Sequence, residues 1–119
     1  MARKHGPGFL ALVDRAKARV PEVSAVMAME MVKRGDALTF VDTREEREWA
    51  AGHIDGAIHL SKGIIERDIE TEIPDKEAVL VLYCGGGYRS ALATDALHQM
   101  GYLRSVSMAG GWRAWNALD

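Results

Sequence analysis

The chain has 119 residues, of which 48% are hydrophobic and 27% are charged, so it is predicted to form one globular domain with its own hydrophobic core. The net charge of −2 gives no general reason to expect nucleic acid as a partner. A single cysteine excludes an internal disulfide and a zinc site built from several cysteines.

The first 21 residues are predicted to be a tail and one helix added to a domain formed by residues 22–119. Glycine and proline predict a mobile tail over residues 1–8. Apolar residues at helical spacing predict a helix over residues 9–19, which packs on the domain and ends at Pro21. We interpret the basic charge of this segment as a solvated surface, with a docking site for a protein partner as the alternative.

A short strand and a helix are predicted next. An extended piece at Glu22–Val23 leads to Ser24, whose side chain suits a helix N-cap. A helix is predicted over residues 25–34, with Gly35 as its stop. The residues expected on its inward face are Val26, Met29 and Val32.

The next predicted strand covers residues 38–41 and ends at Asp42. Thr43 and Glu46 have the spacing of a capping box, so a helix is predicted from Arg44 to Ala51. Two short elements follow, a strand at residues 57–60 and a helical turn at residues 62–67.

The strongest strand is predicted over residues 78–83, where every residue is apolar, as in a central strand buried on both faces of a parallel sheet. A glycine-rich loop, residues 84–89, separates it from a predicted helix over residues 90–100. A strand around Val106 and a helix over residues 112–118 complete the chain. This alternation predicts a doubly wound α/β fold, with a mostly parallel central sheet and helices on both faces.

Cys84 is expected at a ligand-binding edge, because sites of such sheets lie at the carboxyl ends of their strands. Its thiolate is a strong nucleophile, whereas the thiol is a poor one. Three features of the loop favour the anion: the start of the following helix, three consecutive glycines whose N–H groups can turn inward at positive φ, and the charge of Arg89. The alternative is a buried structural cysteine followed by a tight turn.

Three groups of motifs follow one another in a fixed order. They are Asp42-Thr43-Arg44 with Glu48-Trp49 and Gly52-His53-Ile54-Asp55-Gly56-Ala57; Tyr83-Cys84 with Gly87, Arg89 and Ser90; and Gly101-Tyr102 with Gly110-Gly111 and Ala114-Trp115. Over residues 24 to 117, this order resembles the rhodanese-like domain family.

The resemblance implies a single-domain sulfurtransferase. Cys84 would take a sulfane sulfur from a donor, thiosulfate or a persulfide, hold it as a persulfide, and pass it to cyanide or a thiol. The anion cradle implied by the family consists of the amides of Gly85, Gly86, Gly87, Tyr88 and Arg89, with Tyr88 also at the entrance.

The supporting residues implied by the resemblance are Asp42 and Ser90. Arg44 is expected either to bind oxyanions of the donor or, as we favour, to form an ion pair with Asp42 that braces the loop. His53 is expected to be a structural turn residue rather than a general base.

One position departs from the thiosulfate-using members, which often carry a cation beside the cysteine where this chain has Gly85. This departure favours a persulfide donor over thiosulfate. A phosphatase would need a loop one residue longer, and a non-catalytic module usually lacks the cysteine.

No metal or other cofactor is expected, and the expected partners are the small-molecule donor and acceptor, with a sulfur-accepting protein as a further option. A lone cysteine and the lack of a long apolar stretch predict a cytoplasmic protein without a membrane partner.

Overall fold

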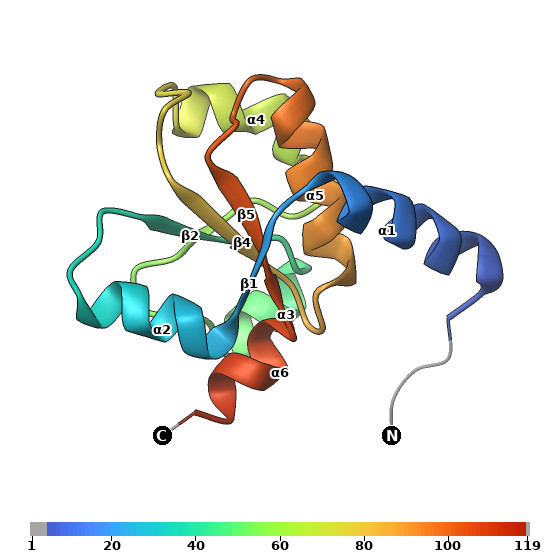
Figure 1. The fold of residues 1–119 in the computed structure, drawn as a ribbon. Helices are drawn as coiled ribbons and strands as arrows, with labels where there is room; N and C mark the ends of the chain where they lie inside the picture. The colour runs from blue at the N-terminus through green and yellow to red at the C-terminus, as the bar shows by residue number, and fades with distance from the viewer. Residues whose placement is uncertain (1–4, 119) are drawn as a thin grey trace.

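The computed structural model describes residues 5–118 and contains one five-stranded parallel sheet with helices on both faces (Figure 1). The strand order is β1-β5-β4-β2-β3. The strands are β1 (Glu22–Ser24), β2 (Thr39–Asp42), β3 (Ile58–His59), β4 (Leu80–Tyr83) and β5 (Ser105–Ala109). The helices are α1 (Pro7–Arg19), α2 (Ala25–Lys33), α3 (Glu46–Ala51), α4 (Ile65–Glu72), α5 (Tyr88–Gln99) and α6 (Gly111–Asn116). The predicted fold class is confirmed.

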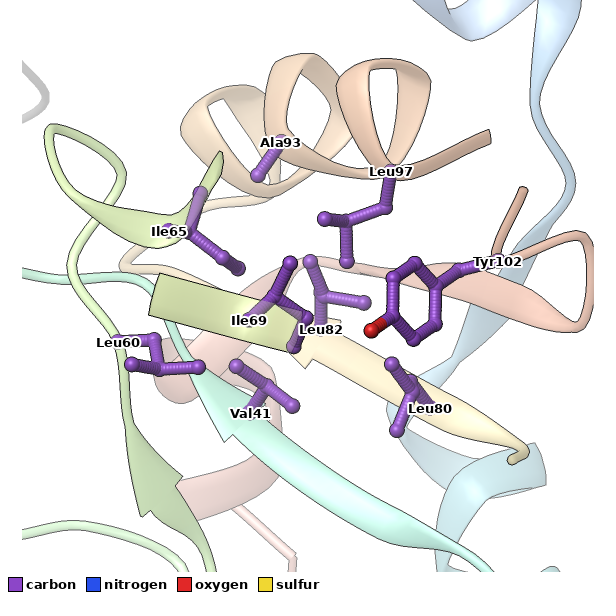
Figure 2. Packing of buried hydrophobic residues seen from close by; sticks show 9 residues of the cluster. All are labelled: Val41, Leu60, Ile65, Ile69, Leu80, Leu82, Ala93, Leu97 and Tyr102. Carbon is purple, nitrogen blue, oxygen red and sulfur yellow. The ribbon is translucent and has the colours of Figure 1, made fainter. Parts of the chain in front are cut away.

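The central strand, β4, is buried on both faces, as its apolar sequence predicts. Successive side chains of a strand point to opposite faces. Leu80 and Leu82 therefore face α4 and α5, in the core cluster that Figure 2 shows. Val81 and Tyr83 face the other way, in a cluster with residues of α2 and α6. This double burial fixes the position of β4 and of the loop that follows it.

The predicted start of α2 agrees with the structure, whereas the predicted start of α1 does not. Ser24 is the N-cap of α2, where its hydroxyl oxygen accepts a hydrogen bond from the Met27 N–H at 3.0 Å. Pro7 occupies the first turn of α1, so this helix starts two residues earlier than predicted. Of the predicted tail, residues 1–4 lie outside the described residues.

The predicted inward face of α2 is wrong by one residue. Val26 and Val32 are 55% and 44% exposed, whereas Ala25 and Ala28 are buried. Met31 continues this stripe and packs against the core. Two alanines let the helix lie close to the sheet, which leaves the larger valines outside.

The predicted capping box of α3 is also wrong. The Thr43 hydroxyl donates to the Tyr83 carbonyl at 2.9 Å, across to the neighbouring strand, and does not cap a helix. The helix begins only at Glu46, and the Glu45 N–H donates to the Glu48 carboxylate at 3.0 Å. The Thr43 hydroxyl therefore joins the ends of β2 and β4 instead of starting the helix.

Two helices are longer than predicted. The turn expected at residues 62–67 is the full helix α4, whose Ile65 and Ile69 are buried while most of its acidic side chains face outward. Helix α5 starts at Tyr88 instead of residue 90, with Gly87 as its N-cap residue at a φ of +102°. The start of α5 is therefore closer to Cys84 along the chain than expected.

Helix α1 lies beside α5 and packs on it (Figure 1). Val13 and Ala16 of α1 are each 1% exposed. Arg19 makes a two-point ion pair with Asp95 of α5, with N···O distances of 3.0 and 2.6 Å. Within residues 5–118, no helix is long and apolar enough to cross a membrane.

Candidate active site

Cys84 directly follows β4 and is 1% exposed. Its Sγ accepts a hydrogen bond from the Gly87 N–H at 3.1 Å. On the other side, Sγ lies 3.5 Å from the Ser90 hydroxyl, which is 2.8 Å from the Ser107 hydroxyl. A hydroxyl can accept from a thiol or donate to a thiolate. The sulfur is therefore held between one backbone donor and a pair of buried hydroxyls.

The loop after Cys84 is glycine-rich for two different reasons. Gly87 has a positive φ of +102°, which side chains rarely adopt. Gly85 and Gly86 do not have positive φ, contrary to the prediction that all three glycines turn in this way. At these two positions a side chain would instead meet neighbouring arginines, at 3.2 Å from Arg89 for Gly85 and at 3.0 Å from Arg113 for Gly86.

The start of α6 forms hydrogen bonds with the backbone of the loop. The Trp112 N–H donates to the Cys84 carbonyl at 2.7 Å, and the Arg113 N–H donates to the Gly85 carbonyl at 3.2 Å. This contact requires Gly111, because a Cβ there would collide with the Cys84 carbonyl oxygen. Gly111 of the closing motif thus helps to position the loop that carries Cys84.

Arg89 lies in the loop as predicted, and its charge has a partner. Its guanidinium donates to both carboxylate oxygens of Glu48 on α3, at 2.9 and 3.1 Å. These hydrogen bonds lower the pKa of Glu48 to about 2 and raise the pKa of Arg89. Both groups are therefore charged at neutral pH, and Glu48 compensates part of the positive charge of Arg89, which also interacts with Cys84.

Asp42 and Arg44 form a buried ion pair at the end of β2. Arg44 is 4% exposed, and its guanidinium donates to Asp42 at 2.8 to 3.1 Å and to the Gly52 carbonyl at 2.6 Å. It also lies over the Trp112 ring, at 5.0 Å from the centroid. These contacts favour the bracing role for Arg44 over contact with a donor. The His53 ring stacks on Trp49 at 3.5 Å, which suits a structural residue.

Tyr88 joins the loop to helix α1. Its ring lies 5.1 Å from the His5 ring and 6.1 Å from the Phe9 ring, and the Lys17 ammonium lies 5.0 Å from its centroid. The sequence placed Tyr88 at the site entrance without a partner. The structure shows that helix α1 supplies two partners, Phe9 and Lys17, and that His5, just before this helix, supplies a third.

Three residues near Cys84 or its loop were not predicted as site residues, namely Ser107, Glu48 and Arg113. Glu48 stood in a recognised motif, but nothing in a single sequence connects it with Arg89, 41 positions later. Arg113 lies in the closing motif, and only the docking of α6 on the loop reveals its position. Among residues 5–118, no three His, Cys, Asp or Glu side chains gather closely enough to hold a metal ion.

Comparison with known proteins decides the family. The model of the rhodanese-like domain matches residues 24–118. The chain belongs to the rhodanese-like domain family. The match begins after α1, so this helix lies outside it.

Three similar proteins extend the comparison. The putative sulfurtransferase YtwF of Bacillus subtilis is 33% identical over 81% of this chain and 90% of its own length. The thiosulfate sulfurtransferase GlpE of Coxiella burnetii is 30% identical over 81% of this chain and 87% of its own. A solved structure from Rhodopseudomonas palustris, described as a protein of unknown function and possible tyrosine phosphatase, has a TM-score of 0.80 and 28% identity, and the match covers 98% of this chain and 94% of that one. The two curated relatives support sulfur transfer as the general activity.

Proposed function

We propose that the chain moves a sulfane sulfur from a donor to a thiophilic acceptor through a persulfide on Cys84. The observation that carries this proposal is the hydrogen bond from the Gly87 N–H to Cys84 Sγ at 3.1 Å, at the start of α5. A backbone donor and a helix N-terminus both stabilise negative charge. They support a thiolate before the transfer and a persulfide anion after it.

The first half-reaction forms one S–S bond and breaks another. The Cys84 thiolate attacks the outer sulfur of thiosulfate, and the electron pair of the old S–S bond leaves with sulfite. With a persulfide donor, the leaving group is the donor's thiolate. Cys84 is 1% exposed, which favours donors whose transferable sulfur is a terminal atom that can enter the loop.

The second half-reaction returns the thiolate. Cyanide or an acceptor thiolate attacks the outer sulfur of the Cys84 persulfide, and the electron pair returns to Cys84 Sγ. In this proposal, Cys84 Sγ stays beside the Gly87 N–H and the Ser90 hydroxyl in both states, so no large rearrangement of the site is needed. The donor and acceptor are small molecules in this proposal, and a protein thiol can take the acceptor's place.

Phosphate-ester hydrolysis is a second candidate, because the Rhodopseudomonas palustris structure is described as a possible tyrosine phosphatase. Such a reaction needs a loop that surrounds a tetrahedral oxyanion. Only four residues separate Cys84 from Arg89, one fewer than that loop requires. Loop length therefore favours sulfur transfer.

Mass spectrometry of the intact chain tests the proposal. Incubation with thiosulfate or a persulfide donor should add one sulfur atom, and cyanide should remove it as thiocyanate. Cys84→Ser should abolish the gain, and because the chain has one cysteine, no other thiol can carry it. If the wild-type chain gains no sulfur from any sulfane donor, the proposal fails. Hydrolysis of an aryl phosphate by the same preparation would favour the second candidate.

A further inference from the structure

Positive charge near the sulfur is scarcer than the sequence suggests. Arg89 is the only cation within the loop Cys84–Arg89, and both of its terminal nitrogens donate to Glu48. The Glu48 carboxylate offsets part of the positive charge that Arg89 offers to an anionic ligand, and Arg89 also interacts with Cys84. A donor with oxyanion groups would therefore need a second cation.

Arg113 of α6 brings such a cation to the loop. Its Nη2 lies 3.0 Å from the position that a Cβ on Gly86 would take, and 3.9 Å from the corresponding position on Gly85. Nη2 of Arg89 lies 3.2 Å from that same position on Gly85. The two guanidinium groups thus approach one glycine pair, from α5 and from α6.

The charge of Arg113 is uncompensated within residues 5–118, where its side chain forms no ion pair and is exposed. Its backbone is fixed, because its N–H donates to the Gly85 carbonyl. The side chain therefore starts from an anchored backbone position next to the loop.

The two glycines under the guanidinium support this assignment. Neither Gly85 nor Gly86 has a positive φ, so backbone conformation does not require glycine there. A Cβ at position 86 would lie 3.0 Å from Nη2 of Arg113, so this guanidinium would have to shift by a few tenths of an ångström. The absence of side chains at Gly85 and Gly86 leaves room for the Arg113 guanidinium next to the loop.

We propose that Arg113 binds the oxyanion end of the sulfur donor and makes the site selective for sulfane donors of the thiosulfate and thiosulfonate class. This inference rests on the proposed function. The Cys84 thiolate attacks the outer sulfur, the S–S bond breaks, and sulfite leaves with the bonding electron pair. Arg113 donates to the sulfonyl oxygens of the donor and to the sulfite that departs. The cation absent at Gly85 is supplied from α6, which reverses the preference for a persulfide donor.

Rapid-quench mass spectrometry of persulfide formation tests the inference with two donors. Thiosulfate carries sulfonyl oxygens, and inorganic hydrodisulfide carries none. Arg113→Gln should lower the second-order rate constant for thiosulfate about tenfold or more, because hydrogen bonds to charged groups are the strong ones. The rate constant for hydrodisulfide should fall much less than that for thiosulfate, because hydrodisulfide has no sulfonyl oxygen to accept from Arg113. Arg113→Lys keeps the charge but loses the planar fork, and should lie between wild type and Arg113→Gln.

Arg104→Gln is the matched control. Arg104 is an exposed arginine before the first residue of β5, at the opposite end of that strand from Gly110, and its loss changes the net charge equally. It should leave both rate constants within about twofold, because distant exposed charges are screened. All variants keep the N–H of residue 113, and thermal melting checks their folding.

The outcomes separate the two proposals. If the wild-type chain is loaded by neither donor, the proposed function is overturned, and the role of Arg113 with it. If the wild-type chain is loaded and Arg113→Gln reacts with thiosulfate as fast as wild type, only the role of Arg113 is overturned. If Arg113→Gln slows persulfide formation equally with both donors, Arg113 acts on Cys84 or on the loop. That result also overturns the proposed selectivity for donors with oxyanion groups.

Discussion

Individual glycines are needed in this fold for reasons that differ from one position to the next. Gly111 has a φ of +54°, and a Cβ there would also meet the Cys84 carbonyl oxygen. Gly35, after α2, has a φ of +80°, with no atom within 4 Å of the position of its missing Cβ. Alanine substitutions at the two positions therefore distinguish the cost of backbone strain alone from the cost of strain with steric overlap.

Gly111→Ala should be clearly more destabilising than Gly35→Ala. Strain at a positive φ costs about 1 kcal/mol, which is the full expected loss at Gly35. At Gly111, separation of α6 from the loop adds to that strain, for a total of about 3 kcal/mol. Urea unfolding of both variants measures the difference. Equal losses would mean that α6 can shift without cost, and the contact would then not be rigid.

At the scale of elements, the sequence predicted strands and sheet better than helix faces and starts. Strand β4 was predictable because its apolar run has one explanation, burial on both sides. The start of α3 was not, because Thr43 fits a capping box by spacing but is closer in space to Tyr83 of the neighbouring strand. Tertiary hydrogen bonds of this kind are invisible in a local pattern.

The candidate site, like the fold, was predicted from the sequence only in part. Cys84, the glycine loop and Arg89 are contiguous, so one stretch of sequence is enough to find them. Glu48, Arg113 and the α1 partners of Tyr88 come from three other elements. Their positions depend on how α3, α6 and α1 dock around the loop, which a single sequence does not specify.

Helix α1 is expected to steady the loop through Phe9. Phe9→Ala removes a ring that packs 6.1 Å from the Tyr88 ring, while Val13 and Ala16 keep the helix docked. We expect a loss of about 1 kcal/mol in the free energy of unfolding. Faster hydrogen exchange is expected at the amides of Gly87 and Tyr88, measured by NMR or mass spectrometry.

Leu12→Ala is the control on the same helix, because Leu12 is 45% exposed. Its stability should change by less than about 0.5 kcal/mol, and protection of the loop amides should stay as in wild type. Unchanged protection in Phe9→Ala would show that α1 lies beside the loop without steadying it.

Across the whole molecule, arginine-carboxylate pairs attach separate elements to α5. Glu48 of α3 pairs with Arg89, and Asp95 of α5 pairs with Arg19 of α1. The arginine partners lower the pKa of both carboxyl groups, that of Glu48 to about 2. The folded protein therefore holds these protons less tightly than the unfolded chain does.

Stability should consequently fall as the pH drops from about 4.5, the usual pKa of a glutamate, to about 2. Above this window, both states carry the Glu48 charge and the pair contributes fully. Within it, the unfolded chain takes up a proton that the folded state resists. Because the Glu48 side chain is 32% exposed, we expect a slope of at most about 1 kcal/mol per pH unit.

Glu48→Gln should remove this part of the acid dependence and lower stability at pH 7 by about 1 kcal/mol. Glu66→Gln is the matched control, because Glu66 is an exposed acid of α4 without an ion-pair partner among residues 5–118. It should leave the acid slope of the wild type in place. Urea unfolding at low salt, in steps from pH 6 to pH 2, measures all three proteins. An equal slope in Glu48→Gln and wild type would assign the acid sensitivity to other carboxylates, and the pair between α3 and α5 would then contribute nothing to stability in acid.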